Sequence, residues 1–325
     1  MQENKNHICH YTSAEGLMGI LNSKQLWATH PRYLNDTGEF NAAFNYILRD
    51  KDKIQRIVED LFGSYYSDQQ LSQGKKGPLD FIKSEEEVSF VREQVRKLIS
   101  EADQNMSENI YVTSFANYEG IDSNTHWLSY AHNITGYCIV FDKKELIENV
   151  IEGVNIEFES VYYGETPDEI LNKVAKIIYE ELVYFYQIAK LSEKQGYSLD
   201  NEAAIHRAHS FLKMNNLLAM YKQVSYKNEL EIRLLVSRLD RIKNNGQIIE
   251  EYDSSEFPEL NFRISTNGAF IPYQPVPIDL NAIKKIIVRS DSHIESKVKS
   301  TEMLLRKFDV EAIVEQSTAT LRTTL

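Results

Sequence analysis

Short, strongly apolar runs separated by long helical stretches constrain the fold of this chain more than any other feature. Three runs rich in β-branched and aromatic residues, at 109–115, 136–142 and 229–237, have the length and composition of buried strands. The stretches 167–191 and 201–221 instead have the apolar spacing of long helices. Strands interrupted by helical excursions in this way predict an α+β fold with a mixed β core.

The rest of the chain continues this alternation without an internal repeat or a linker rich in proline and glycine. Ser13 is expected to cap a helix that follows the first strand, and Gly268 is expected to form a turn between two strands. We therefore predict one domain over 1–325, with helical insertions at about 41–106 and 165–222. The other strands are expected at 8–12, 26–29, 154–163, 264–276 as a pair, 283–288 and 312–314, and a last helix at 292–308.

Charge limits the class of partner. The formal net charge of −12 argues against a general nucleic-acid coat protein, because binding to phosphates depends on Lys and Arg. Local basic stretches at 222–243 and 284–307 leave a basic groove open, although scattered, solvated charges are the ordinary explanation for them.

Cysteine content and hydropathy indicate the compartment. The two cysteines, Cys9 and Cys138, are too few for a disulfide framework or a common zinc site, and their apolar surroundings predict buried free thiols. The polar start of the chain lacks the apolar core of a signal peptide, and no apolar run has membrane-spanning length. These features predict a cytoplasmic protein with no membrane partner.

The run at 229–237 carries acidic residues that a buried strand does not ordinarily hold. Because strand side chains alternate between faces, Glu229, Glu231 and Arg233 are expected to share one face. Two carboxylates at this spacing can position a base and its orienting partner. The alternative is a solvent-facing ladder in which Arg233 and Lys227 bracket Glu231, and the sequence leaves both open.

The first strand carries His10 followed by Tyr11 and Thr12, with His10 and Thr12 expected on one face. A single histidine in a strand is most often structural. His10 is a candidate site residue because a polar loop with Asn35 and Asp36 follows, and Glu39 begins the next helix.

That polar loop has three interpretations. Asn35 or Asp36 can simply cap the helix that follows. The loop can also contribute to a ligand site with His10. As a weaker third alternative, Asp36 and Glu39 could hold a divalent metal with the late glutamates in a nuclease.

A third segment combines a hydroxyl with two aromatic rings. Ser114 lies in a predicted strand, and Trp127 and Tyr130 are spaced to share one helix face. Core packing is the ordinary explanation for such aromatics; the functional one is an aromatic wall for a flat ring such as nicotinamide or adenine. Nearby, Asp122 and His126 are too few to indicate a metal site. The chain also lacks the Walker, Rossmann, His-Glu-x-x-His and Gly-x-Ser-x-Gly motifs.

Taken in order, these residues resemble a bacterial family of domains of unknown function, number 2971, over nearly the whole chain. That family in turn resembles the ADP-ribosyltransferase fold, including the toxins that modify DNA bases. The matching residues are His10-Tyr11-Thr12 with Leu17 and Ile20, Leu26-Trp27, Leu34-Asn35-Asp36 with Glu39, Ser114-Phe115, Trp127 with Tyr130 and Gly136, Glu229-x-Glu231-x-Arg233, and the end near Ser317 and Arg322.

The resemblance implies an ADP-ribosyltransferase-like mixed β core and NAD as a substrate. By position, Glu231 would be the catalytic glutamate and Glu229 the first acid of an E-x-E pair. The other residues that the resemblance and the motifs assign to the NAD site are His10, Tyr11, Thr12, Asn35, Asp36, Glu39, Ser114, Trp127, Tyr130 and Arg233.

The expected function is NAD-dependent ADP-ribosyl transfer by a toxin or phage-defence effector that modifies a nucleic acid or a protein. Such an effector would have an antitoxin or an operon neighbour as a candidate partner. The alternative is a non-catalytic module that senses a nucleotide or ADP-ribose, or that binds another protein.

Overall fold

The computed structural model describes residues 6–34, 52–61, 93, 96, 98, 109–120, 122–131, 136–147, 154–164, 167–196, 199–244, 246–265, 267–290 and 293–319. Its strands are β1 (His7–Thr12), β2 (Gln25–Thr29), β3 (Ile110–Asn117), β4 (Tyr137–Asp142), β5 (Val154–Ser160), β6 (Tyr162–Gly164), β7 (Tyr221–Gln223), β8 (Glu231–Arg238), β9 (Arg241–Asn244), β10 (Gln247–Glu251), β11 (Asn261–Ile264), β12 (Phe270–Pro277), β13 (Ile283–Val288) and β14 (Ile313–Gln316). Its helices are α1 (Ala14–Ser23), α5 (Asn124–Tyr130), α6 (Pro167–Gln195), α7 (Asp200–Ala219) and α8 (Ile294–Lys307), with short 3-10 helices η2 (Pro31–Tyr33), η3 (Val224–Glu229) and η4 (Leu280–Ala282).

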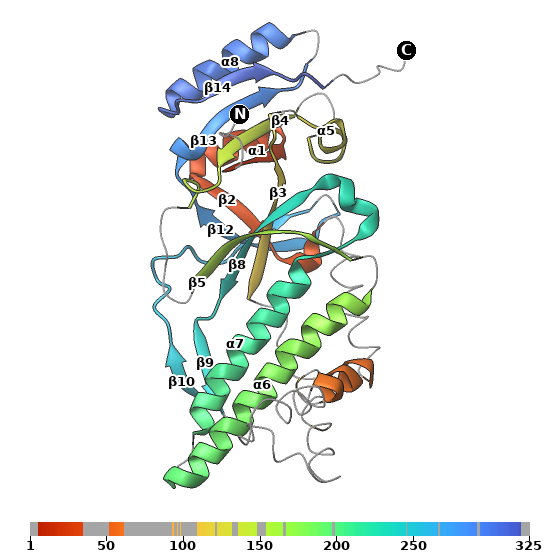
Figure 1. Cartoon of the computed structure of the whole chain (residues 1–325). Helices are drawn as coiled ribbons and strands as arrows, with labels where there is room; N and C mark the ends of the chain where they lie inside the picture. The colour runs from red at the N-terminus through yellow and green to blue at the C-terminus, as the bar shows by residue number, and fades with distance from the viewer. Residues whose placement is uncertain are drawn as a thin grey trace.

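The fold is α+β, as the sequence predicts, and its main sheet mixes antiparallel pairs with the parallel pair β13–β14. The long helices α6 and α7 lie side by side and extend from one end of the sheet, whereas α8 and β14 lie at the opposite end (Figure 1). Among the residues that the structure describes, no helix combines the length and the apolar character needed to cross a bilayer.

Strand β3 joins the parts of the main sheet. One of its edges pairs with β8 along nearly its whole length. Its other edge is shared: β1 pairs with Ala116 and Asn117, and β2 pairs with Val112. The sheet therefore forks at β3, with β1, β4, β13 and β14 in one arm and β2, β12 and β11 in the other.

The two faces of β3 and β8 pack against different apolar clusters. On one face, Val112 and Leu235 pack with residues of α6 and α7. On the other face, Phe115 and Leu234 pack with residues of α1, β4 and β13. Because side chains alternate along a strand, Ser114 shares the helix-covered face with Val112.

Most of the predicted elements are confirmed. Ser13 caps α1 by accepting a hydrogen bond from the Gly16 amide at 3.1 Å, and β13 has the predicted bounds. Cys9 and Cys138 are buried and free. The short strands β7, β9 and β10 were not predicted, because their polar composition carries no apolar alternation. Most of the predicted insertion at 41–106 lies outside the described residues.

Candidate functional site

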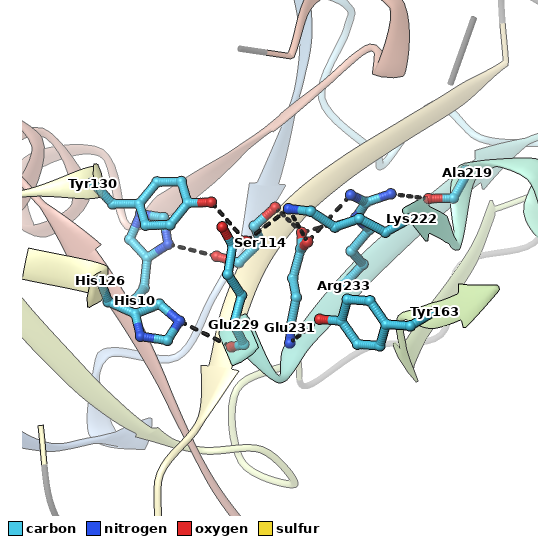
Figure 2. A network of polar contacts seen from close by, with 10 residues as sticks. All are labelled: His10, Ser114, His126, Tyr130, Tyr163, Ala219, Lys222, Glu229, Glu231 and Arg233. Carbon is cyan, nitrogen blue, oxygen red and sulfur yellow. Dashed lines mark hydrogen bonds and ion pairs between the residues drawn. The ribbon is translucent and has the colours of Figure 1, made fainter. Parts of the chain in front are cut away.

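Adjacent strands bring three predicted site residues together on the helix-covered face of the sheet. In the register of β3 and β8, Ser114 lies opposite Arg233, and Ala116 lies opposite Glu231. Lys222 reaches the same place from β7, directly after α7. Figure 2 shows these side chains converging on Glu231 and Glu229.

Both carboxylate oxygens of Glu231 are occupied. Oε1 accepts hydrogen bonds from Ser114 Oγ at 2.5 Å and Arg233 Nε at 2.8 Å. Oε2 accepts from Lys222 Nζ at 3.1 Å and Arg233 Nη2 at 3.2 Å. A carboxylate has about four lone-pair positions, so these contacts satisfy the group. The residue is only 6% exposed, which makes Glu231 a rigidly held buried charge.

The charges around Glu231 determine its protonation. Burial alone raises the pKa of the Glu231 carboxyl, but Arg233, Lys222 and the Ser114 hydroxyl together outweigh burial and lower the pKa below its usual value. Glu231 is therefore ionised at neutral pH. Counting the described residues, the network contains with Glu229 two carboxylates and two cations, whose charges balance.

Glu229 does not lie on the strand, and this corrects the prediction that Glu229, Glu231 and Arg233 alternate along one strand face. Glu229 ends η3, and β8 begins only at Glu231. Between them, Leu230 has a left-handed backbone with φ 44° and a side chain that is 59% exposed. A left-handed conformation is unfavourable for leucine, and here it turns both glutamates toward Lys222.

Glu229 binds the network through one oxygen. Its Oε2 accepts hydrogen bonds from Lys222 Nζ at 2.7 Å and Tyr130 Oη at 2.8 Å. Lys227, which the sequence offered as a neighbour of Glu231 in a solvent-facing ladder, is exposed and is not a partner of either carboxylate. Lys222 takes that place, with its ammonium group also 4.7 Å from the centre of the Tyr226 ring.

His10 lies in the fork between the two arms of the sheet. Its Nδ1 is 2.9 Å from the Ser114 carbonyl oxygen, which accepts only, so Nδ1 carries the proton. The ring packs against Phe115 with centroids 5.6 Å apart. Burial lowers the pKa of His10, which favours the neutral form. Ser114 therefore contacts both His10, through its carbonyl, and Glu231, through its hydroxyl.

Tyr11 and Thr12 have structural partners. The Tyr11 ring is buried and stacked on His126, with centroids 5.2 Å apart and planes at 15°, and its hydroxyl accepts a hydrogen bond from the Ser123 amide. Thr12 Oγ1 lies against Gly16 of α1, where an added Cβ would come within 2.0 Å of it. Only glycine fits at Gly16 without moving Thr12.

Trp127 packs inside the protein, which agrees with core packing and not with the alternative of an open aromatic wall. Its side chain is 0% exposed, and Nε1 donates a hydrogen bond to Asp122 Oδ2 at 2.6 Å. Asp122 also accepts from the Ser317 and Thr318 hydroxyls, and the Arg289 guanidinium lies 5.2 Å from the Trp127 ring centre. The carboxylate of Asp122 is thereby occupied by Trp127, Ser317 and Thr318.

Two further residues complete the network and were not assigned to it from the sequence. His126 Nε2 donates to the Glu229 carbonyl at 2.9 Å, and burial lowers the pKa of this imidazole. The Glu231 amide donates to the Tyr163 hydroxyl at 2.8 Å. Both contacts join segments that are distant in sequence, so no local motif predicts them. Asn35, Asp36 and Glu39 lie outside the described residues.

The comparisons with known proteins are sparse. Residues 126–234, about a third of the chain, match the model of a family described as "Protein of unknown function (DUF2971)". The matched segment contains Trp127, Tyr130, Lys222, Glu231 and the other residues of the network except those of β1 and β3. No curated protein and no solved structure gives a significant match.

Proposed function

We propose that this protein is an NAD-dependent ADP-ribosyltransferase whose site is built around Glu231, Glu229, Ser114 and His10. The observation that carries the proposal is the double contact of Ser114, which binds the imidazole of the first strand through its carbonyl and the carboxylate of β8 through its hydroxyl. The resemblance to the transferase fold requires an imidazole and a late-strand glutamate to meet in this way.

The chemistry assigned to Glu231 is electrostatic. In ADP-ribosyl transfer the bond between the nicotinamide nitrogen and ribose C1′ breaks, nicotinamide leaves with the electron pair, and positive charge develops on the ribose. A fixed carboxylate beside the ribose stabilises this charge without having to reorganise. Arg233 and Lys222 support the role because they keep Glu231 ionised and in one position.

The second acid has a different role. Glu229 carries its hydrogen bonds on Oε2 and has more side-chain exposure than Glu231, at 11% against 6%. We assign it to the acceptor, whose nucleophile forms the new bond to C1′ and gives its proton to Glu229. Tyr130 and Lys222 hold Glu229 in place for this step. Trp127 has no direct role in this proposal.

The biological setting proposed with this chemistry is an effector in the cytoplasm, either a toxin or a phage-defence protein, that modifies a nucleic acid or a protein. This part is supported by the resemblance to transferases that modify DNA bases. An antitoxin or operon partner belongs to the same proposal.

A second candidate function is a nucleotide or ADP-ribose sensor that binds without turnover. The observation that favours it is the saturation of Glu231, both of whose oxygens are already occupied by Ser114, Lys222 and Arg233. A sensor needs only a balanced, rigid network beside its ligand. A transferase must let Glu231 exchange at least one of these contacts for the ribose.

Nicotinamide release and calorimetric binding separate the two functions. The purified chain is incubated with NAD, nicotinamide is quantified by chromatography, and binding of NAD and ADP-ribose is measured by titration. A transferase releases nicotinamide, and Glu229→Gln lowers transfer to an acceptor more than it lowers NAD binding. Glu251→Gln, at a glutamate whose side chain is 57% exposed, is the matched control and should change neither quantity.

For Glu231 itself, a single substitution confounds catalysis with stability, because it removes a carboxylate that contacts two buried cations. The double variant Glu231→Gln/Lys222→Met removes one charge of each sign and keeps the network balanced. Saturable binding by the wild type without nicotinamide release supports the sensor. A folded double variant that releases nicotinamide at the wild-type rate rules out Glu231 as the catalytic group.

A further inference from the structure

A separate cavity lies at the opposite end of β3 and β8 from Ser114 and Glu231. Its volume is about 580 Å³, within the range of sites for small molecules. Arg238, the last residue of β8, lines this cavity, whereas Glu231 is the first residue of the same strand. At about 3.3 Å per residue, the cavity therefore lies roughly 23 Å from the carboxylate network. We call it the Arg32 pocket, after a residue of η2 that lines it.

The floor of the Arg32 pocket is rigid. Arg238 uses all five N–H groups of its guanidinium: Nε and Nη2 contact Asp240, Nη2 also contacts Ser254, and Nη1 contacts Pro258 and Gln274. Gln274 is 0% exposed, and its Nε2 also donates to the Pro258 carbonyl at 2.6 Å. The polar groups of the floor already hydrogen-bond to one another. We therefore expect a ligand to be recognised by the groups at the rim.

The turn that supplies one side of the rim is held by His30. The Arg32 amide donates to His30 Nδ1 at 3.2 Å, so Nδ1 is unprotonated. Burial, with a contribution from the Arg32 charge, lowers the pKa of His30 to about 4. The His30 ring also makes edge contacts with Tyr33 and Tyr111. The position of Arg32 and Tyr33 is therefore fixed over the physiological pH range.

The rim carries groups that are available to a ligand. The side chains of Arg32, Asn109 and Glu259 are exposed and have no hydrogen-bond or ion-pair partner within the part of the chain that the structure describes. Two rings also line the pocket in exposed positions, Tyr33 at 42% and Phe262 at 56%. The rim thus combines a free cation, a free anion, a free amide and two aromatic faces.

We propose that the Arg32 pocket binds a mononucleotide with an amino-substituted base, such as AMP. Its base would stack on Phe262 or Tyr33, its amino group would face Glu259 and Asn109, and its phosphate would pair with Arg32. The mixed charge favours a ligand with more than an anionic group, and the exposed aromatic rings suit a flat base. This inference does not depend on the proposed transferase activity.

The test compares AMP with adenosine by calorimetric titration. Arg32→Gln should weaken AMP binding by roughly tenfold or more and leave adenosine binding unchanged, because adenosine lacks the phosphate. Phe262→Ala should weaken both ligands. Arg263→Gln and Phe270→Ala change the same residue types outside the pocket, on the hairpin of β11 and β12 that carries Phe262, and they should leave both affinities unchanged.

Several results overturn the inference. These are no saturable AMP binding by the wild type at millimolar concentration, equal losses of AMP and adenosine binding in Arg32→Gln, or equal losses in the control variants. Binding of phenylalanine, a small aromatic zwitterion, in preference to AMP would also contradict it. The balanced variant Glu231→Gln/Lys222→Met should retain AMP binding, so failure of the transferase proposal and failure of this one give different results.

Discussion

Substitution of Glu231 by glutamine is expected to destabilise the protein strongly, and the magnitude follows from its surroundings. The change removes a 6%-exposed carboxylate that accepts hydrogen bonds from Lys222, Arg233 and Ser114. Among the residues that the structure describes, it leaves the network with two buried cations and one carboxylate, that of Glu229. Breaking a buried ion pair by removing one partner costs about 3–5 kcal/mol, because the remaining charge stays desolvated.

A second substitution tests whether charge balance is the cause. Glu231→Gln alone gives the network a net charge of +1, and adding Lys222→Met returns it to zero. The double variant should therefore be less destabilised than the sum of the two single variants, by about 1–3 kcal/mol of coupling free energy. The methionine side chain also fills most of the volume that the lysine stem occupied.

The assay is urea unfolding of the four proteins in this cycle, followed by circular dichroism and by the fluorescence of the buried Trp127. The exposed pair Arg241–Glu251 supplies the control cycle. Its N–O distance is 2.7 Å, shorter than the 3.1 Å of Lys222–Glu231, but its side chains are 58% and 57% exposed. An exposed pair contributes about 0–1 kcal/mol. Equal coupling in the two cycles, or additive effects in the buried one, would refute the role assigned to burial.

Four other outcomes can be measured by the same unfolding assay. Leu230→Gly should equal or exceed the wild type in stability, and Leu230→Val should be less stable by about 1–2 kcal/mol, because a left-handed backbone suits glycine and opposes a β-branched residue. Gly16→Ala should cost about 1–3 kcal/mol through its overlap with Thr12 Oγ1, and Thr12→Ala should restore part of the loss; no recovery would exclude the overlap. Lowering the pH from 6.5 toward 4 should reduce the free energy of unfolding, because the unfolded chain protonates His30 and the folded chain does not; His30→Gln should flatten this slope, and an unchanged slope would contradict the assignment. Below about pH 4.5, a further loss should come from Glu231, whose pKa is depressed in the folded state, and it should be smaller in Glu231→Gln.

The sequence predicted the elements whose signals are local. Ser13 is a side-chain cap placed directly before an amphipathic helix, and the strand at 283–288 is rich in β-branched residues, so both were identified correctly. The strand-like alternation of side chains that was predicted from Glu229 onward is wrong at its start, because Leu230 interrupts it. Leu230 adopts a backbone conformation that its side chain does not favour, and propensity cannot predict such a strained position.

The site was only partly predictable, for a different reason. Ser114 and Glu231 were identified as separate candidates, but their contact depends on the register of β3 with β8. The cation that binds both glutamates, Lys222, follows a long helix, and nothing in its own neighbourhood distinguishes it from Lys227. His10 meets Ser114 only because the sheet forks at β3. These contacts are tertiary, and composition and periodicity do not encode them individually.

The central claim is that the carboxylates beside Ser114 act on NAD, and proton NMR of NAD mixed with the wild-type protein tests it most directly. If the carboxylates act on NAD, its ribose H1′ signal should decay and the signals of free nicotinamide should grow at a rate proportional to the protein concentration. An NAD spectrum that neither broadens nor changes in the presence of folded protein would contradict it.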